Sequence, residues 1–482
     1  MSEITPMRIG PDLVTHDHDD VIVVRSPYDG HEVGRVPEGT AADVDAAVAA
    51  ALACHRAGAP EAHERAAILD RAAARLAEPE VHEHFARSIA EESAKPITTA
   101  RSEVTRAVDT FRFSAATART LAGEVVPLDA SSAAAGSGKV GFVLRVPVGV
   151  VAAISPFNFP LNLVAHKVAP AIAAGCPVVL KPASATPLTA LMLAGLLLDD
   201  CGLPPGWLNV VTIPGRLADH LVTHDDVKLI TFTGSPEVGW GIRAKAAHKR
   251  VGLELGNNAP VVIEPDADLP SAAKKISVAG FSFAGQSCIS VQRVFVHESV
   301  MEPFLAELVP LVDALHVGDP LDDDTDVSAL IDEGETDRVR KAIDAAVEAG
   351  ATVATGNTLD DHGVLRPTVL THATPDMDVC RTEIFGPVIA LATYRNYGEA
   401  LRLANDTRYG LQAGVFTADL GKALQAARTL DFGGVLVNEV PTWRADQMPY
   451  GGVRDSGNTR EGPAYAVHEM TEIRLVILQP PG

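Results

Sequence analysis

Short apolar runs alternate with helical patterns from residue 148 onward, and this alternation constrains the fold more than any other feature. Residues 149–154, Gly-Val-Val-Ala-Ala-Ile, have the wholly apolar character of a strand that is buried on both faces of a parallel sheet. Helical patterns at 164–174 and 186–201 separate this run from the further apolar runs at 177–180, 208–211 and 229–232. The alternation predicts a doubly wound α/β domain, an architecture that commonly binds a nucleotide.

A second alternation begins near residue 259. It has strand patterns at 260–263 and 292–296 and helical patterns at 301–315 and 336–349. Before the first alternation, residues 40–122 have the spacing of helices, and residues 140–146 that of a strand that Pro147 ends. An apolar strand at 474–478 stands alone near the C-terminus. Because a lone strand cannot bury itself, we expect it to pair across a domain or subunit boundary.

Composition limits the classes of protein to consider. A chain of 482 residues is long enough for two or three domains. Its net charge of −22 argues against nucleic acid or an anionic membrane as a partner. Five irregularly spaced cysteines suggest neither a disulfide framework nor a zinc site. No apolar signal or bilayer-length run is visible in the sequence, so we expect a cytoplasmic protein in a reducing compartment.

Cys288 is the most informative single residue. Free cysteines are usually buried and inert, but Cys288 follows a small polar turn, Gly285-Gln286-Ser287, and Glu254 lies upstream in Leu-Glu-Leu-Gly. A thiol nucleophile and a carboxylate base are the two groups needed to oxidise an aldehyde through a covalent thioester. Together the two motifs favour a catalytic role for Cys288.

Two strand ends carry candidate polar groups. Residues 155–160 read Ser-Pro-Phe-Asn-Phe-Pro, and Asn158 there could donate its amide to a developing oxyanion. The alternative is a proline-rich turn whose Asn caps its own backbone. Lys181 could reach ribose or phosphate oxygens, although an exposed lysine before a turn is an equal alternative.

Three turn-rich motifs have weaker signals. The Gly234–Ser235 turn before a predicted helix could hold a pyrophosphate on its backbone N–H groups, but it is not a GxGxxG sequence. Glu383 and Phe385 could meet a ribose and a cofactor ring, or lie in an ordinary loop. Residues 448–457 form either a loop lining a site or a surface connection.

In this order and at this spacing, the motifs resemble those of the NAD(P)-dependent aldehyde dehydrogenase superfamily, over nearly the whole chain. The resemblance implies that Cys288 is the nucleophile, Glu254 the base that activates the deacylating water, and Asn158 the oxyanion donor. It also implies cofactor contacts from Ser155, Phe157, Lys181, Ser184, Gly234, Ser235, Glu383 and Phe385.

The resemblance also implies a fold with a modified Rossmann cofactor domain, an α/β catalytic domain and a small bridging β-sheet. The cofactor domain would comprise residues 1–127 and 148–255 with part of 440–462, and the catalytic domain residues 256–439. Residues 128–147 and 463–482 would form the bridging sheet, which implies a homodimer or homotetramer.

Three positions depart from the family pattern. Ser184 replaces a glutamate that would repel a 2′-phosphate, so NADP becomes plausible while NAD is not excluded. Asn257 replaces a glycine beside the base, which we expect to restrict the swing of Glu254, and Thr459 replaces a glycine in a late motif.

The substrate pocket is expected to contain Arg106 and Arg444. Two guanidinium groups at one pocket mouth would bind a carboxylate, phosphate or phosphonate. The alternative is that Asp446, Glu103 or Glu439 pairs with them. The remaining residues expected at the pocket are Phe159, His166, Ser287 and Ile289.

The loop at 440–455 is similar to that of members acting on phosphonoacetaldehyde, lactaldehyde or glyceraldehyde 3-phosphate (non-phosphorylating). We therefore expect NAD(P)-dependent oxidation of a short, anionic aldehyde, of these or a semialdehyde type, with a neutral hydroxyaldehyde or an aromatic aldehyde as alternatives. A CoA-acylating enzyme is disfavoured because such members generally lack the base that Glu254 provides. A non-catalytic binding protein on the same fold is the remote alternative.

Overall fold

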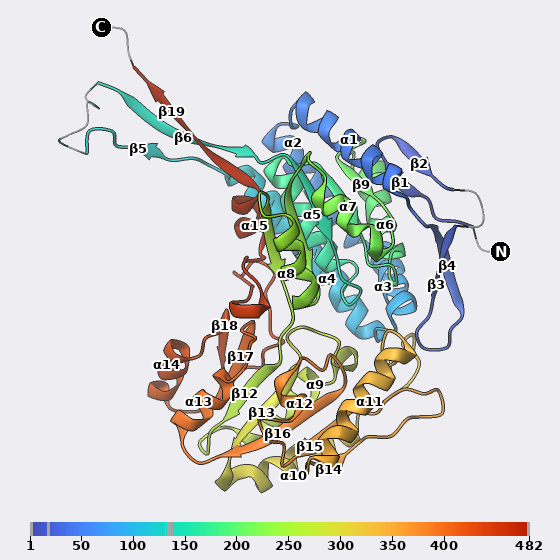
Figure 1. Ribbon diagram of the computed structural model, residues 1–482, viewed down its shortest axis with the longest axis vertical. Helices are drawn as coiled ribbons and strands as arrows, with labels where there is room; N and C mark the ends of the chain where they lie inside the picture. The colour runs from blue at the N-terminus through green and yellow to red at the C-terminus, as the bar shows by residue number, and fades with distance from the viewer. Residues whose placement is uncertain (1–2, 17–19, 131, 133–135, 137, 480–482) are drawn as a thin grey trace.

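The computed structural model describes residues 3–16, 20–130, 132, 136 and 138–479 (Figure 1). It has two lobes, each built on a seven-stranded sheet, and a long β-arm that extends from one lobe. Parts of the segments predicted for the cofactor domain and the bridging sheet, at 1–2, 17–19, 131, 133–135, 137 and 480–482, lie outside the described residues.

The first sheet has the strand order β11-β10-β7-β8-β9-β1-β2. The five strands from β11 to β9 in this order run parallel, and β1 and β2 add an antiparallel edge. The strand bounds are β1 Met7–Ile9, β2 Asp12–Val14, β7 Val150–Ile154, β8 Val178–Lys181, β9 Leu208–Val210, β10 Val227–Thr233 and β11 Arg250–Glu254. The predicted doubly wound arrangement is confirmed here, because apolar strands alternate with helices as the sequence indicated.

Eight α-helices that precede the second sheet in the described chain belong to this lobe, and the first four form the predicted helical segment. They are α1 Ala41–Ala57, α2 Ala62–Leu76, α3 Pro79–Ser93, α4 Ile97–Thr120, α5 Asn162–Ala174, α6 Leu188–Gly195, α7 Ala218–Thr223 and α8 Pro236–Lys245. Short helical turns lie at Leu196–Asp200, which is π-helical, and at Gly215–Leu217. Helix α5 is buried along its whole length between α4, α2 and the sheet, which fixes its N-terminal end firmly.

The second sheet has the order β14-β15-β16-β13-β12-β17-β18 and is parallel except for β14 at its edge. Its strands are β12 Ala259–Ile263, β13 Val291–His297, β14 Thr352–Thr355, β15 Thr368–Thr371, β16 Val388–Tyr394, β17 Gln412–Phe416 and β18 Gly434–Val437. Its helices are α9 Leu269–Ala279, α10 Met301–Asp313, α11 Glu333–Glu348, α12 Asp378–Arg381, α13 Tyr397–Asn405 and α14 Leu420–Thr429. Further 3₁₀ turns lie at Ser282–Gly285, Glu298–Val300 and Arg454–Ser456.

The arm is a three-stranded antiparallel sheet in the order β19-β6-β5. Strand β19 (Thr471–Leu478) follows helix α15 (Pro463–Glu469) and pairs along its whole length with β6 (Val140–Pro147), and β5 (Val125–Val126) lies on the far side of β6. The orphan terminal strand thus finds its partner in a segment more than 320 residues earlier, as the resemblance implied.

A separate hairpin, β3 (Val21–Arg25) and β4 (Glu32–Pro37), completes the described strands. The division into domains at the residues given above stays a prediction. Within the described ranges, no helix combines the length and apolar character needed to cross a membrane.

Candidate active site

The site lies at the carboxyl edge of the first sheet. Strands β7, β8, β10 and β11 are parallel neighbours, and they end at Ile154, Lys181, Thr233 and Glu254. The motifs that follow these strands therefore meet along one edge, where ligands bind in open α/β sheets. Cys288 comes from the opposite lobe, on the segment that leads into β13.

A cavity of about 670 Å³ lies along this edge and is walled by both lobes. It brings together most of the residues expected for catalysis and cofactor binding. These are Phe157, Asn158, Gly234, Ser235, Glu254, Cys288, Glu383 and Phe385.

A smaller cavity, of about 30 Å³, adjoins the first and shares Cys288 and Glu254 with it. Five of the residues expected for substrate line it, namely Arg106, Phe159, Ser287, Ile289 and Arg444. Tyr450 and Glu461 complete its polar wall. The thiol therefore lies where a long cavity meets a small one.

A strained segment presents the thiol. Phe283 and Ala284 both have a φ of 52°, and Gly285 follows with a φ of 72°. Non-glycine residues rarely adopt this left-handed conformation, and strain of this kind is concentrated at functional sites. At Gly285 a Cβ would lie 2.1 Å from the carbonyl oxygen of Gly386, so only glycine fits.

The sulfur of Cys288 lies 2.9 Å from the hydroxyl oxygen of Tyr450. Burial raises the pKa of the Cys288 thiol to about 12, and the hydrogen bond with Tyr450 opposes that rise. The thiol is therefore protonated at neutral pH in this arrangement, and it needs a base nearby to become a nucleophile.

Glu254 is a suitable base. Its side chain is buried, and within the described structure neither carboxylate oxygen has a hydrogen-bond partner. Burial, followed by the charge of Glu461, raises the pKa of Glu254 well above its usual value, while Arg444 and Lys167 oppose the rise. A carboxylate with a raised pKa is a stronger proton acceptor, which suits general base catalysis near neutral pH.

Asn158 is buried between the two loops. Its Nδ2 donates to the carbonyl oxygen of Gln286 at 2.9 Å, two residues before the nucleophile. An amide carries two N–H donors, so one remains for a ligand in the cavity. This placement suits a donor to an oxyanion formed at Cys288.

The other end of the large cavity has features that fit a dinucleotide. Ser235 caps helix α8, with its side chain accepting from Val238 N at 3.4 Å, and Ser235, Pro236 and Glu237 at the start of this helix line the cavity. Phe385 and Phe157 meet edge to face, with ring centroids 5.9 Å apart, and offer a surface for a flat ring.

Glu383 accepts from Asn257 N at 2.9 Å. Burial raises the pKa of Glu383 to about 8. At Gly256 a Cβ would lie 2.2 Å from Oε2 of Glu383, so this glycine is needed for the close approach of the carboxylate. The arrangement leaves a carboxyl group on the cavity wall that can accept hydrogen bonds from ribose hydroxyls.

Three expected cofactor residues do not line these two cavities. Ser155 and Lys181 are buried, Lys181 Nζ donates to the carbonyl oxygen of Pro182 at 3.1 Å, and burial lowers the pKa of Lys181 to about 8. Ser184 is exposed. Their neighbours Pro156 and Ala183 line the large cavity, so the three residues lie at its border.

The two arginines are paired within the chain. Arg106 binds Asp446 through two hydrogen bonds, of 3.2 and 2.9 Å, and Arg444 binds Glu461 at 2.9 Å. The Arg444 guanidinium also lies over the Tyr450 ring, 3.9 Å from its centroid. Of the expected internal partners, Asp446 binds Arg106, whereas Arg444 has Glu461, which was not among those expected. The proposed partners Glu103 and Glu439 bind Lys95 and Lys275 instead.

His166 does not line either cavity, and the expectation that it faces the pocket is wrong. Its side chain is fully buried, with Nε2 lying 2.9 Å from Asp446 Oδ1 and 3.0 Å from Arg444 Nη2. The imidazole therefore supports the groups that reach the pocket wall and does not reach it itself.

Two residues of the wall were not expected from the sequence. Tyr450 and Glu461 both lie in motifs that were singled out, but no role was assigned to either. The density of turn formers around Tyr450 was the available signal. Its contact with Cys288 depends on the meeting of segments 162 residues apart, which no local pattern indicates. No group of residues suited to hold a metal ion is found in the part of the chain that the structure describes.

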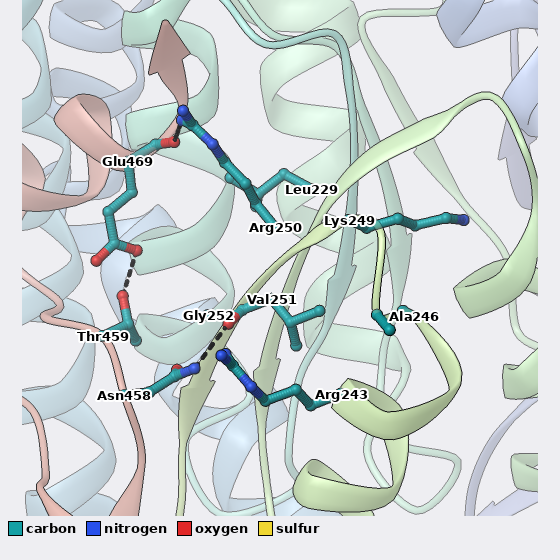
Figure 2. Close-up of a pocket in the computed structure, with 11 residues that line it drawn as sticks. Leu229, Arg243, Ala246, Lys249, Arg250, Val251, Gly252, Asn458, Thr459 and Glu469 are labelled. Carbon is teal, nitrogen blue, oxygen red and sulfur yellow. Dashed lines mark hydrogen bonds between the residues drawn. The ribbon is translucent and has the colours of Figure 1, made fainter.

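The two unusual replacements have local explanations. Asn257 does not have a positive φ, so its backbone does not require glycine, and its side chain donates to Gln412 O at 3.2 Å. Thr459 lies by a separate pocket of about 580 Å³ near the base of the arm, shown in Figure 2. There its hydroxyl donates to the carboxylate of Glu469. Desolvation raises the pKa of Glu469, and the hydrogen bond from Thr459 opposes this rise.

The fold and these groups define an oxidoreductase of the dinucleotide-dependent α/β type. The family model that matches the chain is that of the aldehyde dehydrogenase family, over residues 14–476. The chain belongs to this family, whose cofactor is NAD or NADP, and the protein is an enzyme that acts on aldehydes.

Named relatives cover nearly the whole chain. The 3-sulfolactaldehyde dehydrogenase of Priestia megaterium is 45% identical over 457 residues, which are 94% of each chain. The lactaldehyde dehydrogenase of Methanocaldococcus jannaschii is 40% identical over 403 residues, 83% of this chain and 85% of the other. Among solved structures, the NADP complex of glyceraldehyde-3-phosphate dehydrogenase from Bacillus halodurans is 36% identical, covers 99% of both chains and has a TM-score of 0.95.

Proposed function

We propose that this enzyme oxidises a short 2-hydroxyaldehyde bearing an anionic group, of the 3-sulfolactaldehyde type, to the carboxylate. The observation that carries the proposal is the pair of guanidinium groups, from Arg106 and Arg444, on the wall of the small cavity that contains Cys288. The 45% identity to a 3-sulfolactaldehyde dehydrogenase supports the same class of substrate.

The chemistry follows from three residues. The Cys288 sulfur attacks the aldehyde carbon, and the Asn158 amide, with the backbone N–H of Cys288, donates to the resulting oxyanion. NAD or NADP, which the helix α8 turn, Glu383 and the Phe385 ring would hold, would accept the hydride that leaves the aldehyde carbon, and loss of this hydride converts the Cys288 adduct into a thioester. Glu254 then takes a proton from water, which hydrolyses the Cys288 thioester and releases the carboxylate.

The two arginines have different tasks in this proposal. Arg106 is 29% exposed and uses Nε and Nη2 on Asp446, so other N–H donors of its guanidinium remain for a sulfonate or phosphate. Arg444 is only 5% exposed and is held by Glu461 and the Tyr450 ring. It contributes positive potential at the wall, while Arg106 makes the direct contact.

The test compares kcat/KM for 3-sulfolactaldehyde and for lactaldehyde, which lacks the sulfonate. We expect a preference for the anion above about 100-fold, equivalent to about 2.7 kcal/mol in the transition state. Arg106→Gln should remove most of this preference and leave lactaldehyde turnover within about threefold.

Equal values for the two aldehydes would contradict the proposal. They would favour the second candidate, a neutral 2-hydroxyaldehyde such as lactaldehyde. One observation favours that candidate: both arginines already have carboxylate partners within the chain.

The proposed roles of the thiol and the base have their own test. Cys288→Ala should abolish turnover, and Glu254→Gln should give one burst of reduced cofactor followed by a stall at hydrolysis. An unchanged steady-state rate in Glu254→Gln would exclude Glu254 as the base. Formation of an acyl-CoA when CoA is added would support the CoA-acylating alternative.

The arm supports a proposed homodimer or homotetramer. Ile473, Leu475 and Ile477 alternate along β19 and are each more than half exposed. A contiguous apolar face of this kind marks an interaction site. The choice between NAD and NADP and a cytoplasmic location also stay predictions.

A further inference from the structure

Lys95 is a charged residue buried between the two catalytic loops. It lies in the turn between α3 and α4, and its side chain has no exposed surface. Its Nζ forms an ion pair with Glu103 and donates to the carbonyl oxygen of Asn158 at 2.6 Å. Placing a lysine here is costly, since burial alone disfavours its charge and lowers its pKa.

Glu103 extends the contact to the other end of the same loop. While one carboxylate oxygen binds Lys95, the other accepts from the N–H groups of Leu161 and Asn162, at 2.9 and 3.0 Å. The ion pair therefore holds the 158–162 segment at both ends, just before helix α5 begins.

The ammonium group also touches the loop that carries the nucleophile. It lies 3.7 Å from the centroid of the Phe159 ring and 4.6 Å from that of Phe283. Phe283 is the first of the three left-handed residues that lead to Cys288. One side chain thus contacts the segment of the oxyanion donor and the segment of the thiol.

We propose that Lys95, together with Glu103, is a positioning residue that fixes the Asn158 amide against the Cys288 loop. The inference rests on the role of Asn158 given under the proposed function. Neither Lys95 nor Glu103 lines the two cavities, so neither touches the reacting atoms. A buried ion pair is poor evidence for stability, because an apolar pair of the same volume often stabilises a fold as well. An apolar pair, however, would leave the Asn158 carbonyl and two backbone N–H groups unbonded.

The test variant is Lys95→Met/Glu103→Gln. Methionine keeps the length of the lysine stem without its ammonium group, and the glutamine carbonyl can still accept from the N–H groups of Leu161 and Asn162. The measurement is the single-turnover rate of cofactor reduction at saturating aldehyde, in this double variant, in Asn158→Ala and in the triple variant. Since a misplacement of about 1 Å can cost about 100-fold in rate, we expect the double variant to be about tenfold to 100-fold slower.

The decisive comparison is made in the Asn158→Ala background. If Lys95 acts through Asn158, the triple variant should be within about threefold of Asn158→Ala. A wild-type rate in the double variant would overturn the inference but not the proposed role of Asn158. The same holds if the rate losses of the double variant and of Asn158→Ala multiply in the triple variant. A wild-type rate in Asn158→Ala would instead overturn the proposed oxyanion role, and the inference with it.

A matched control lies in the other lobe. Lys422 pairs with the buried carboxylate of Glu264. Glu264 follows the end of β12, whereas Cys288 precedes the start of the parallel neighbour β13, so the pair lies at the opposite end of the sheet and outside both cavities. Lys422→Met/Glu264→Gln should lower the thermal midpoint without changing the single-turnover rate. If the Lys95 double variant does not fold, Glu103→Gln alone replaces it. We then expect Glu103→Gln to lower the single-turnover rate by about threefold to tenfold, and to cause no further loss when it is added to Asn158→Ala. If the two losses multiply in the combined variant, the inference is overturned.

Discussion

The Cys288 thiol and the Glu254 carboxyl both lie where burial disfavours their charged forms. Burial raises the pKa of each, the thiol to about 12, while Tyr450 opposes the shift at the sulfur. A carboxylate whose pKa is raised accepts a proton more readily than an ordinary carboxylate does, and Glu254 lines the same cavity as the thiol.

The raised pKa of Cys288 predicts how its reactivity depends on pH. Without cofactor, alkylation of Cys288 by iodoacetamide should accelerate about tenfold for each pH unit between pH 7 and 10, because only the thiolate reacts. Mass spectrometry of the Cys288 peptide would separate this reaction from that of other cysteines. Tyr450→Phe should slow alkylation throughout this range, since it removes the hydrogen bond that lowers the pKa. A plateau below pH 9 would contradict the prediction.

Thr459 offers a stability prediction at the same scale. Thr459→Val removes the hydroxyl that donates to the carboxylate of Glu469, a solvent-exposed residue that also has a backbone hydrogen bond from Arg460. The free energy of unfolding should fall by about 1 kcal/mol, the net contribution of one ordinary hydrogen bond. Urea unfolding would measure the change, and Thr459→Ser, which keeps the hydroxyl, should stay close to the parent.

The sequence was most informative about residues that a local motif surrounds. Cys288, Glu254 and Asn158 each lie in such a motif, and the structure brings all three to one cavity, while their roles stay predictions. Lys95 had no motif, because its contacts come from segments 63 and 188 residues later in the chain. The partners of Arg106 and Arg444 likewise depended on three-dimensional packing.

At the scale of elements, the apolar runs at β7, β8, β9 and β10 of the first sheet were predicted, whereas the buried strands β15, β16 and β17 of the second sheet and the short edge strands were not. Strand β7 is buried at every position and reads as an unbroken apolar run, whereas β2 and β14 are short and half exposed. Strand β11 carries Glu254 at its last position but mixes charged and apolar residues. Its sequence therefore indicated a catalytic motif but did not predict a strand. The helix expected at 186–201 was interrupted by a π-helical turn at Leu196–Asp200.

The arm gives the element-scale prediction. Leu475→Lys places a charge in the exposed apolar row of β19, so we expect a smaller assembly in light scattering coupled to size-exclusion chromatography. Arg474→Lys, on the alternate face of the strand, is the control and should leave the mass unchanged. An unchanged mass in Leu475→Lys would show that this face is not an oligomer contact.

At the scale of the whole molecule, the large cavity takes its walls from both lobes. Ser235 comes from the first lobe, and Glu383 and Phe385 come from the second. The doubly wound fold could be predicted because the spacing of apolar residues along the chain shows which strands and helices are buried. The particular aldehyde could not, because it depends on how a few polar side chains pair around a cavity of about 30 Å³.

A ligand that contacts both lobes should stabilise the whole molecule. At a concentration of NAD⁺ or NADP⁺ 100 times its Kd, the free energy of unfolding should rise by about 2.7 kcal/mol. Thermal unfolding with each cofactor in turn would also show which one binds more tightly. Glu383→Ala should raise the cofactor concentration that is needed for the same stabilisation. The absence of stabilisation by either cofactor would contradict the proposed binding site.

The close contact between Gly285 and Gly386 has a mechanical consequence. These glycines belong to the segments that carry Cys288 and Phe385, and their backbones approach too closely for any side chain to lie between them. Since packed interiors transmit strain, the two segments must shift together. Any displacement of the Phe385 segment by an arriving nicotinamide would therefore be passed to the sulfur without an intervening side chain.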